Sequence, residues 1–470
     1  YYRAYRWATD RVGDHGIVAF VSNGGWIDGN TADGVRLSFA DDFAHVWVFN
    51  LRGNMRKANW KEEGGQIFGA GSQTTIAVFV GVKDTAHTGP AQIHYRDIGD
   101  YLDREQKLRI IDAGTVDTLE WDTIVPNTSG DWVGQRDDMF GAWPVIAERR
   151  KPTRGGVFTR FSRGVESARD AWMYSYSRDA LTANVRRMVG NYNALHEPFA
   201  AFCESRSIRR PKEADVTAFL TAHPEFARED VMKWSASLKQ HLARGTRTHF
   251  DSMSIAKGSY RPFDQQYVYF NKMLNHRQGE LPSMFPTPYH RNYGIVLTAP
   301  ASHFDFTPFI TDLLPNLHLL DTGQFFPRYA FERVDASEVG ELDLGSTADI
   351  SELDGWGYRR VDNITDEILG IYRTALDDSV TKDQIFWSVY GQLHVRAYRE
   401  TYAADLKKML PHIPTPESLE RFTQLADAGE QLGGLHMRYE DVDPYPLDVE
   451  IRAGVDEHDR ETWRVQKMKW

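Results

Sequence analysis

Short apolar runs alternate with helical stretches in the first hundred residues. Residues 16–21, 44–50 and 75–82 are rich in Val, Ala and Phe and predict three strands. Residues 1–11 and 33–43 predict helices that precede or separate these strands. Strands that alternate with helices are typical of an α/β domain with a mostly parallel sheet. Because little helix separates the last two strands, we expect that pair to run antiparallel at an edge of the sheet.

The pattern changes after about residue 100, and a domain boundary is predicted near 97–103. Loops such as residues 126–131 and short strands such as 291–297 are mixed with helices predicted at 180–195 and 215–223. This mixture predicts an α+β region over residues 101–340.

Helical patterns dominate from about residue 362, so residues 341–470 are predicted as a helical C-terminal part. Helices are expected at 365–376, at 382–410 with a break near Gly391, and at 416–432. Pro411 and Pro414 follow the second of these and end it, since proline cannot continue a helix.

Composition indicates a globular protein of a reducing compartment. The 470 residues are 41% hydrophobic and 13% aromatic, enough for a sizeable core. A single cysteine, Cys203, excludes a disulfide framework and a cysteine-ligated zinc site. No apolar run approaches the roughly 18 residues that span a bilayer. We therefore expect a cytoplasmic protein without a membrane partner.

Charge is distributed unevenly along the chain. The net charge is −11, yet residues 141–290 contain 23 Lys and Arg against 14 Asp and Glu. A basic middle between acidic flanks is expected of a protein that binds a phosphate backbone. Chance variation of the surface would give the same pattern, so charge alone leaves both interpretations open.

The glycine-rich segment Gly64–Ser72 does not fit a nucleotide-phosphate loop. No lysine follows Gly69 as the Walker motif requires, and a dinucleotide fingerprint that starts at Gly69 meets Thr74 in place of its third glycine. The segment also leads into a strand rather than a helix. Phe68 lies within it, and its ring must either pack locally or stack on a ligand. The histidines show no metal-binding spacing, so no metal site is predicted.

Arginines are interleaved with aromatic residues over residues 149–176. Arginine can bind phosphates or the edge of guanine, and aromatic faces can stack on bases. The alternative for Trp172, Tyr174 and Tyr176 is a strand that packs into a core, and it is the favoured interpretation for these rings. For the arginines of this segment, DNA binding and a structural role are equally open.

Taken together, several segments resemble the part that follows the catalytic Asn-Pro-Pro-Tyr motif in γ-class DNA adenine-N6 methyltransferases. They are most similar to the single-chain Type ISP restriction-modification enzymes, in which nuclease, helicase, methyltransferase and target-recognition domains follow one another. The resemblance extends over nearly the whole chain. It is carried by YRAYRW (2–7), GIVAFVSNGGW (16–26), DGVR (33–36), NLRGN (50–54), Gly64–Val82, GDW (130–132), RDAW (169–172), YRPFD (260–264), FFPRY (325–329) and residues 390–414.

This resemblance implies the distal half of an α/β methyltransferase-like sheet, followed by an α+β target-recognition domain with a helical C-terminal part. It implies that Phe68 stacks on an adenine flipped out of the duplex. It also implies that the region after about residue 120 contacts double-stranded DNA. Charge and position within that region give the candidate DNA-binding residues Arg136, Arg154, Arg160, Arg163, Arg169, Lys257, Arg261 and Arg277.

The chain lacks the Asn-Pro-Pro-Tyr motif and the glycine-rich loop that binds S-adenosylmethionine, which precede this region in the family. We therefore expect a fragment of an enzyme that methylates adenine N6 with S-adenosylmethionine. The remaining methyltransferase half and the helicase and nuclease domains would be its partners in the same polypeptide. The fragment alone is expected to bind no cofactor and to have no catalytic residue.

Two alternatives remain open at this point. The chain could be a stand-alone DNA-recognition module without a catalytic parent. It could also be a carbohydrate-active enzyme, given its 13 Trp and 21 Tyr. The second alternative requires two carboxylates about 5 to 10 Å apart in an aromatic cleft.

Overall fold

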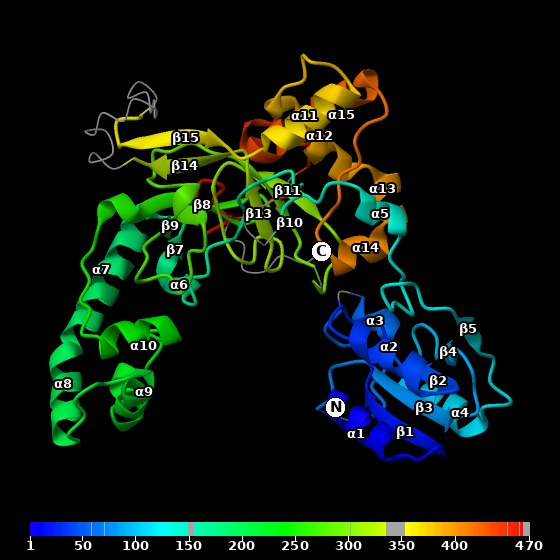
Figure 1. The fold of residues 1–470 in the computed structure, drawn as a ribbon. Coiled ribbons are helices and arrows are strands. Elements are labelled where there is room, and N and C mark those ends of the chain that lie inside the picture. The colour runs from blue at the N-terminus through cyan, green and yellow to red at the C-terminus, as the bar shows by residue number, and fades with distance from the viewer. Residues whose placement is uncertain are drawn as a thin grey trace, which may run out of the picture.

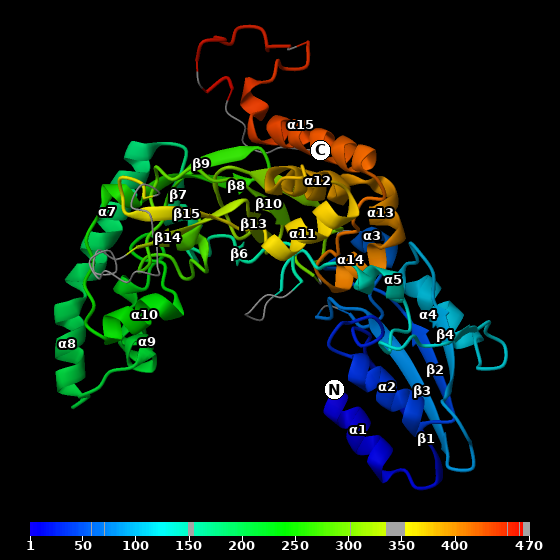
Figure 2. The ribbon, with the colours of Figure 1, turned by 45° about the horizontal axis from the view of Figure 1, so that its top comes forward.

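The computed structural model describes residues 1–57, 59–69, 71–148, 155–300, 302–334, 353–448, 450–459 and 461–463. These residues form an arch (Figures 1 and 2). An N-terminal sheet with its helices makes one leg, a group of helices makes the other, and two sheets with the C-terminal helices make the span. None of the described helices combines the length and apolar character that a bilayer span requires.

The N-terminal leg is built on a five-stranded sheet of order β1-β3-β2-β4-β5. The three strands predicted from the apolar runs are confirmed, but the prediction of a mostly parallel sheet is wrong: only β2 and β4 run parallel. β3 lies between β1 and β2 rather than at an edge, and it is antiparallel to both. The strands are β1 (His15–Asn23), β2 (His45–Asn50), β3 (Ile76–Asp84), β4 (Gln92–Asp97) and β5 (Asp122–Ile124).

Helices cover both faces of this sheet. α1 (Tyr2–Arg11) and α2 (Asp33–Asp42) confirm the predicted helices and pack on a core that includes Phe79. α4 (Arg104–Ala113) packs on the opposite face, and the short α3 (Trp60–Glu63) precedes the glycine-rich segment. Because α4 and β5 belong to this leg, the sheet continues beyond the boundary predicted near 97–103.

The second leg is a group of helices. The helices predicted at 180–195 and 215–223 are confirmed, with small shifts of their ends. The group comprises α7 (Arg178–Ala194), α8 (His196–Ser205), α9 (Glu213–Ala222) and α10 (Ala236–Ala243). Leu181, Val185 and Met188 place one side of α7 in a core shared with the neighbouring sheet.

The span contains two four-stranded sheets and a hairpin. The first has the order β11-β10-β13-β6 and the second the order β12-β8-β9-β7; β14 pairs with β15. The bounds are β6 (Ser162–Arg163), β7 (Tyr174–Ser175), β8 (Ile255–Arg261), β9 (Asp264–Tyr269), β10 (Gly294–Leu297), β11 (Pro308–Thr311), β12 (Leu314–Pro315), β13 (Gln324–Pro327), β14 (Tyr329–Arg333) and β15 (Tyr358–Asp362).

The first of these sheets is buried on both faces. Ile295 and Leu297 of β10 join one core with the C-terminal helices, whereas Val296 between them joins the core of the helical leg. Alternating side chains point to opposite faces of a strand, so one short strand serves both cores. The parts predicted as 101–340 and 341–470 therefore share a core.

The C-terminal helices confirm the predicted helical character. Gly391 does not break α12; the breaks fall at Val395 and Tyr402. A side chain at Gly391 would lie 2.3 Å from the carbonyl oxygen of Leu425, so this glycine allows α12 and α15 to approach closely. The helices are α11 (Asp366–Ala375), α12 (Lys382–His394), α13 (Arg396–Thr401), α14 (Ala403–Lys408) and α15 (Leu419–Met437); α5 (Asp138–Ala142) and α6 (Asp170–Met173) are short.

Candidate nucleic-acid interface

Arg169 is a structural residue rather than a surface cation. Its side chain is buried, and its guanidinium donates to the carbonyl oxygens of Lys233 and Leu274 and to the hydroxyl of Ser235. Burial lowers the pKa of Arg169 to about 10. The DNA contact that we predicted for Arg169 is therefore replaced by a role in joining the segment before α10 to two segments of the span.

Three other predicted cations are engaged within the protein. Arg136 Nε lies 2.7 Å from a carboxylate oxygen of Asp131. Arg160 pairs with Glu332 at 2.6 Å, and Arg261 donates to the carbonyl of its neighbour and to Asn316. All three are only partly exposed, so these contacts compete with any contact to DNA.

Arg163, Arg277 and Lys257 are the exposed members of the predicted set. Arg163 lies on β6, and the backbone of Arg277 pairs with that of Glu166 just beyond β6. Neither arginine has a carboxylate partner among the residues that the structure describes. Lys257 on β8 lies over the ring of Tyr267 at 4.5 Å. Arg154 lies outside the described residues.

The aromatic residues of the same segment divide between core and surface. Trp172 lies in α6 and Tyr174 begins β7, and both are buried, as the core interpretation requires. Tyr176 is exposed. A single strand was therefore the wrong element for Trp172, although its burial is confirmed.

Phe68 projects from an anchored loop. Its side chain is 52% exposed, so about half of it is open to a ligand, and stacking on a ligand stays a prediction. The backbone around it is held by the start of α4: the amide of Gly65 donates to Leu102 at 2.8 Å and Arg104 Nε to Ile67 at 2.9 Å. The arrangement presents an aromatic ring on a fixed support.

A buried lysine completes this support. The ammonium of Lys107 donates to the carbonyl oxygens of Leu51 and Glu63 at 2.9 and 2.7 Å, and burial lowers its pKa. Leu51 belongs to the segment before α3, and Glu63 is the last residue of α3. Lys107 therefore ties α4 to the chain that leads into the Phe68 loop, and nothing in the local sequence pattern indicated this.

A polar hollow of about 190 Å³ opens at the ends of β1 and β2 from which this loop departs. The Asn23 amide donates to the hydroxyl of Thr74 at 2.8 Å, and the Asn50 amide donates to the hydroxyl of Tyr95 at 3.0 Å. Amide and hydroxyl groups of this kind can bind the polar edge of a base. The loop that carries Phe68 therefore begins and ends at residues that line this hollow, Asn50 and Thr74.

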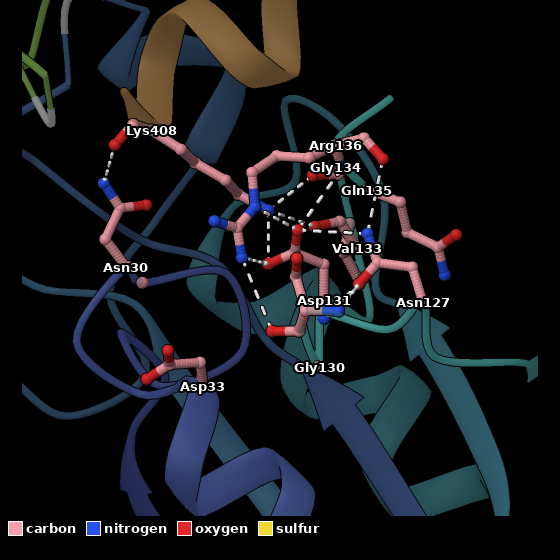
Figure 3. Close-up of polar contacts among 12 residues, drawn as sticks. Asn30, Asp33, Asn127, Gly130, Asp131, Val133, Gly134, Gln135, Arg136 and Lys408 are labelled. Atoms are coloured by element: carbon pink, nitrogen blue, oxygen red, sulfur yellow. Dashed lines mark hydrogen bonds and ion pairs between the residues drawn. The ribbon is translucent and has the colours of Figure 1, made fainter. Parts of the chain in front are cut away.

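Asp131 forms the joint between the N-terminal leg and the span. This buried carboxylate lies 3.3 Å from Arg36 of α2, 2.7 Å from Arg136 and 3.1 Å from Lys408 at the end of α14. Figure 3 shows Lys408 reaching across to the loop that holds Asp131, where its ammonium also donates to Gly134. Asn30 of the leg donates in turn to the carbonyl of Lys408.

The stability of the chain should depend on the ionisation of Asp131. Burial alone would raise the pKa of Asp131, but hydrogen bonds from Arg136 and Lys408 lower it to about 2, against a usual 3.8. A lowered pKa means that this stabilisation is complete above pH 3.8 and is lost as the pH falls toward 2. Urea unfolding of wild type and Asp131→Asn between pH 5 and pH 2.5 measures it. Equal pH dependence of the two proteins would contradict the assignment.

The joint at Asp131 connects a sheet-bearing leg to the sheets and helices of the span, and comparison with known sequences assigns most of this arrangement to a family. The profile of the Type ISP C-terminal specificity domain matches residues 156–470. Because this is more than half of the sequence, the chain belongs to the Type ISP specificity-domain family. The carbohydrate-active alternative is thereby set aside. No curated protein matches the chain.

Three solved structures are similar over nearly the whole chain. A nuclease-deletion mutant of the Type ISP restriction-modification enzyme LlaGI, in complex with a DNA substrate mimic, has a TM-score of 0.74 and 32% identity over 94% of this chain and 37% of that chain. The DrdV–DNA complex has a TM-score of 0.75 and 30% identity over 98% and 42%. The ATP-dependent Type ISP enzyme LlaBIII, bound to DNA, has 0.72 and 26% over 97% and 27%. The chain spans less than half the length of each.

Proposed function

We propose that this chain recognises a specific sequence in double-stranded DNA and supplies one wall of the pocket in which a restriction-modification enzyme methylates adenine N6. The main support is the similarity, over 94% or more of this chain, to three solved structures of proteins bound to DNA or to a DNA substrate mimic. S-adenosylmethionine and the catalytic motif would be held by the part of the enzyme that lies outside this chain. The resemblance of residues 1–82 to methyltransferases supports this division.

The arch offers a place for the duplex between its legs. β6 lies on the side of the span that faces the opening (Figure 2), and Arg163 on β6 is exposed. The segment of Arg277 runs beside it, since the amide of Glu280 donates to the hydroxyl of Ser162 at 3.0 Å. Two guanidinium groups on adjoining segments, neither of them paired with a carboxylate of the described residues, can bind neighbouring phosphates.

Replacement of Arg163 and Arg277 by alanine should weaken duplex binding, and the size of the loss should depend on the salt concentration. The Arg163→Ala/Arg277→Ala chain is expected to bind every duplex sequence more weakly. The slope of log Kd against log salt concentration should fall by about 2, one per lost phosphate contact. Fluorescence anisotropy with a labelled duplex at several salt concentrations measures both quantities.

The matched control removes two arginines from the outer side of the arch. Arg396 of α13 and Arg421 of α15 are exposed, and Figure 2 places these helices away from the opening. The Arg396→Ala/Arg421→Ala chain should keep the wild-type slope. If the two double variants bind duplex equally, the proposed path of the DNA is wrong.

The free edge of β1 supports the proposal of a missing partner half. β1 has nine residues, and β3 is its only partner among the described strands; Ile17 and Val21 on β1 are exposed. A long edge strand with exposed apolar side chains favours pairing with a further strand. We propose that the remaining half of the methyltransferase sheet pairs here, in the same polypeptide as the helicase and nuclease domains.

A further inference from the structure

An aromatic hollow beside the β14–β15 hairpin shares no lining residue with the Phe68 loop, the Asp131 joint or the Arg163 and Arg277 pair. It has a volume of about 690 Å³ and lies between the loop that precedes β10 and the turn that leads into β15. Its lining combines aromatic rings with arginines, namely Tyr289, Trp356, Phe331, Tyr358, Arg291 and Arg360. Volumes of this order hold small ligands in other proteins.

Two of its rings form an exposed stack. The rings of Tyr289 and Trp356 lie 5.5 Å apart at an angle of 10°. Their exposed fractions are 63% and 52%, so the stack is not covered by any described part of the chain. Large aromatic side chains left open to solvent as a parallel pair offer a surface on which a further flat group can stack.

Two arginines accompany the stack. Arg291 and Arg360 are both exposed, and neither forms an ion pair with a carboxylate within the described ranges, although the charge of Arg291 acts on Asp312, a carboxyl whose pKa is raised by burial. The guanidinium of Arg360 lies over the ring of Tyr329 at 4.4 Å, which limits its motion. Positive charge beside an aromatic platform fits a ligand that joins a flat ring to an anion.

The hollow is preformed by a buried histidine. Nδ1 of His290 lies 2.7 Å from the hydroxyl of Thr287, and Nε2 lies 2.7 Å from a carboxylate oxygen of Asp354. The same carboxylate accepts from the amides of Trp356 and Tyr358 at 2.8 and 3.0 Å. The loop of Tyr289 and the turn of Trp356 are thus tied together before any ligand binds.

The hollow adjoins the proposed DNA path. Arg160, two residues before β6, pairs with Glu332 of β14 at 2.6 Å, and Glu332 also pairs with Arg359 of β15 at 3.1 Å. Asn363, just after β15, donates to the carbonyl of Arg160 at 2.8 Å. The hairpin is therefore fixed to the chain that leads into β6.

We propose that this hollow binds an unpaired nucleotide of DNA, with its base stacked on the Tyr289–Trp356 pair and its phosphate on Arg291 or Arg360. The inference rests on the proposed function of the chain and adds a second kind of contact to it. Stacking needs a base that has left the duplex, whereas Arg163 and Arg277 bind the duplex backbone. Because every base has an aromatic face, the site should accept any sequence.

The test uses the 470-residue chain and a fluorescein-labelled oligothymidylate of about 12 nucleotides. Trp356→Ala is expected to weaken its binding about tenfold, since stacking on one ring commonly accounts for a change of that size. Trp356→Phe should restore most of the affinity, and Arg291→Ala/Arg360→Ala should weaken it with a reduced salt dependence. Trp7→Ala is the matched control, because Trp7 is likewise exposed and has Arg11 over its ring.

The outcomes separate this site from the proposed function. Equal weakening by Trp7→Ala and Trp356→Ala, or no binding of oligothymidylate by a chain that binds duplex, would overturn the site and leave duplex recognition standing. Trp356-dependent binding of oligothymidylate without duplex binding would support the site and contradict the proposed function. Tyr289→Ala, with a melting temperature measured beside it, repeats the test if Trp356→Ala fails to fold.

Discussion

Replacement of Asp131 by alanine should lower the free energy of unfolding by about 3 to 5 kcal/mol, the range for removal of one partner from a buried ion pair. Asp131 and Arg36 are each about 1% exposed, and Lys408 is 6% exposed. Without the carboxylate these cations lie close together in a medium that solvates them poorly. Urea unfolding at pH 7 measures the loss.

The control for this prediction is an exposed ion pair. Asp10 pairs with Arg6 on α1, and both side chains are about half exposed, so Asp10→Ala should destabilise the chain far less than Asp131→Ala. Since Asp131 also joins the leg to the span, Asp131→Ala should increase the radius of gyration measured by small-angle scattering. A loss similar to that of Asp10→Ala would show that water or other groups solvate the cations.

The second large effect is expected at Phe68. In an enzyme that contains this chain together with the remaining methyltransferase half, Phe68→Ala should slow adenine methylation about tenfold to hundredfold. Duplex binding should change little, because the ring is proposed to hold only the flipped base. Single-turnover methylation and duplex affinity, measured on the same preparation, separate the two effects.

Phe68→Tyr keeps a flat ring and should retain most of the activity. Ile67→Ala is the packing control: Ile67 is buried beside Phe68, so its truncation should lower the melting temperature without a specific loss of methylation. Equal loss of methylation and duplex binding in Phe68→Ala would favour a structural role for the ring.

Three strands and two helices of the N-terminal leg could be predicted, as could the antiparallel direction of β2 and β3, but the order of the strands could not. The apolar runs of β1, β2 and β3 identify strands because Val, Ile and Phe are enriched in strands. β4 reads QIHYRD, and its polar residues hide it from such a search. The order of strands in a sheet depends on tertiary packing. β3 lies between β1 and β2, and no local sequence pattern indicates this position.

We predicted from the sequence that arginines contact DNA, but the sequence did not show which of these arginines are exposed. Arg163 and Arg169 are six residues apart and look alike in sequence, yet one is exposed and the other is enclosed by segments near residues 233 and 274. Only the fold brings those segments to Arg169. The same holds for Asp131, whose partner Lys408 is far along the chain.

The sheet β11-β10-β13-β6 has a consequence for the exchange of specificity between relatives. Ile295 and Val296 contribute to cores on opposite sides of it, so a graft that replaced this sheet would have to match two sets of neighbours at once. Hybrids made by transplanting the helical leg or the hairpin, with seams placed outside the sheet, should fold more often. Relatives that recognise different DNA sequences are likewise expected to differ mainly in the helical leg and the hairpin, with the exchanged segments ending outside this sheet.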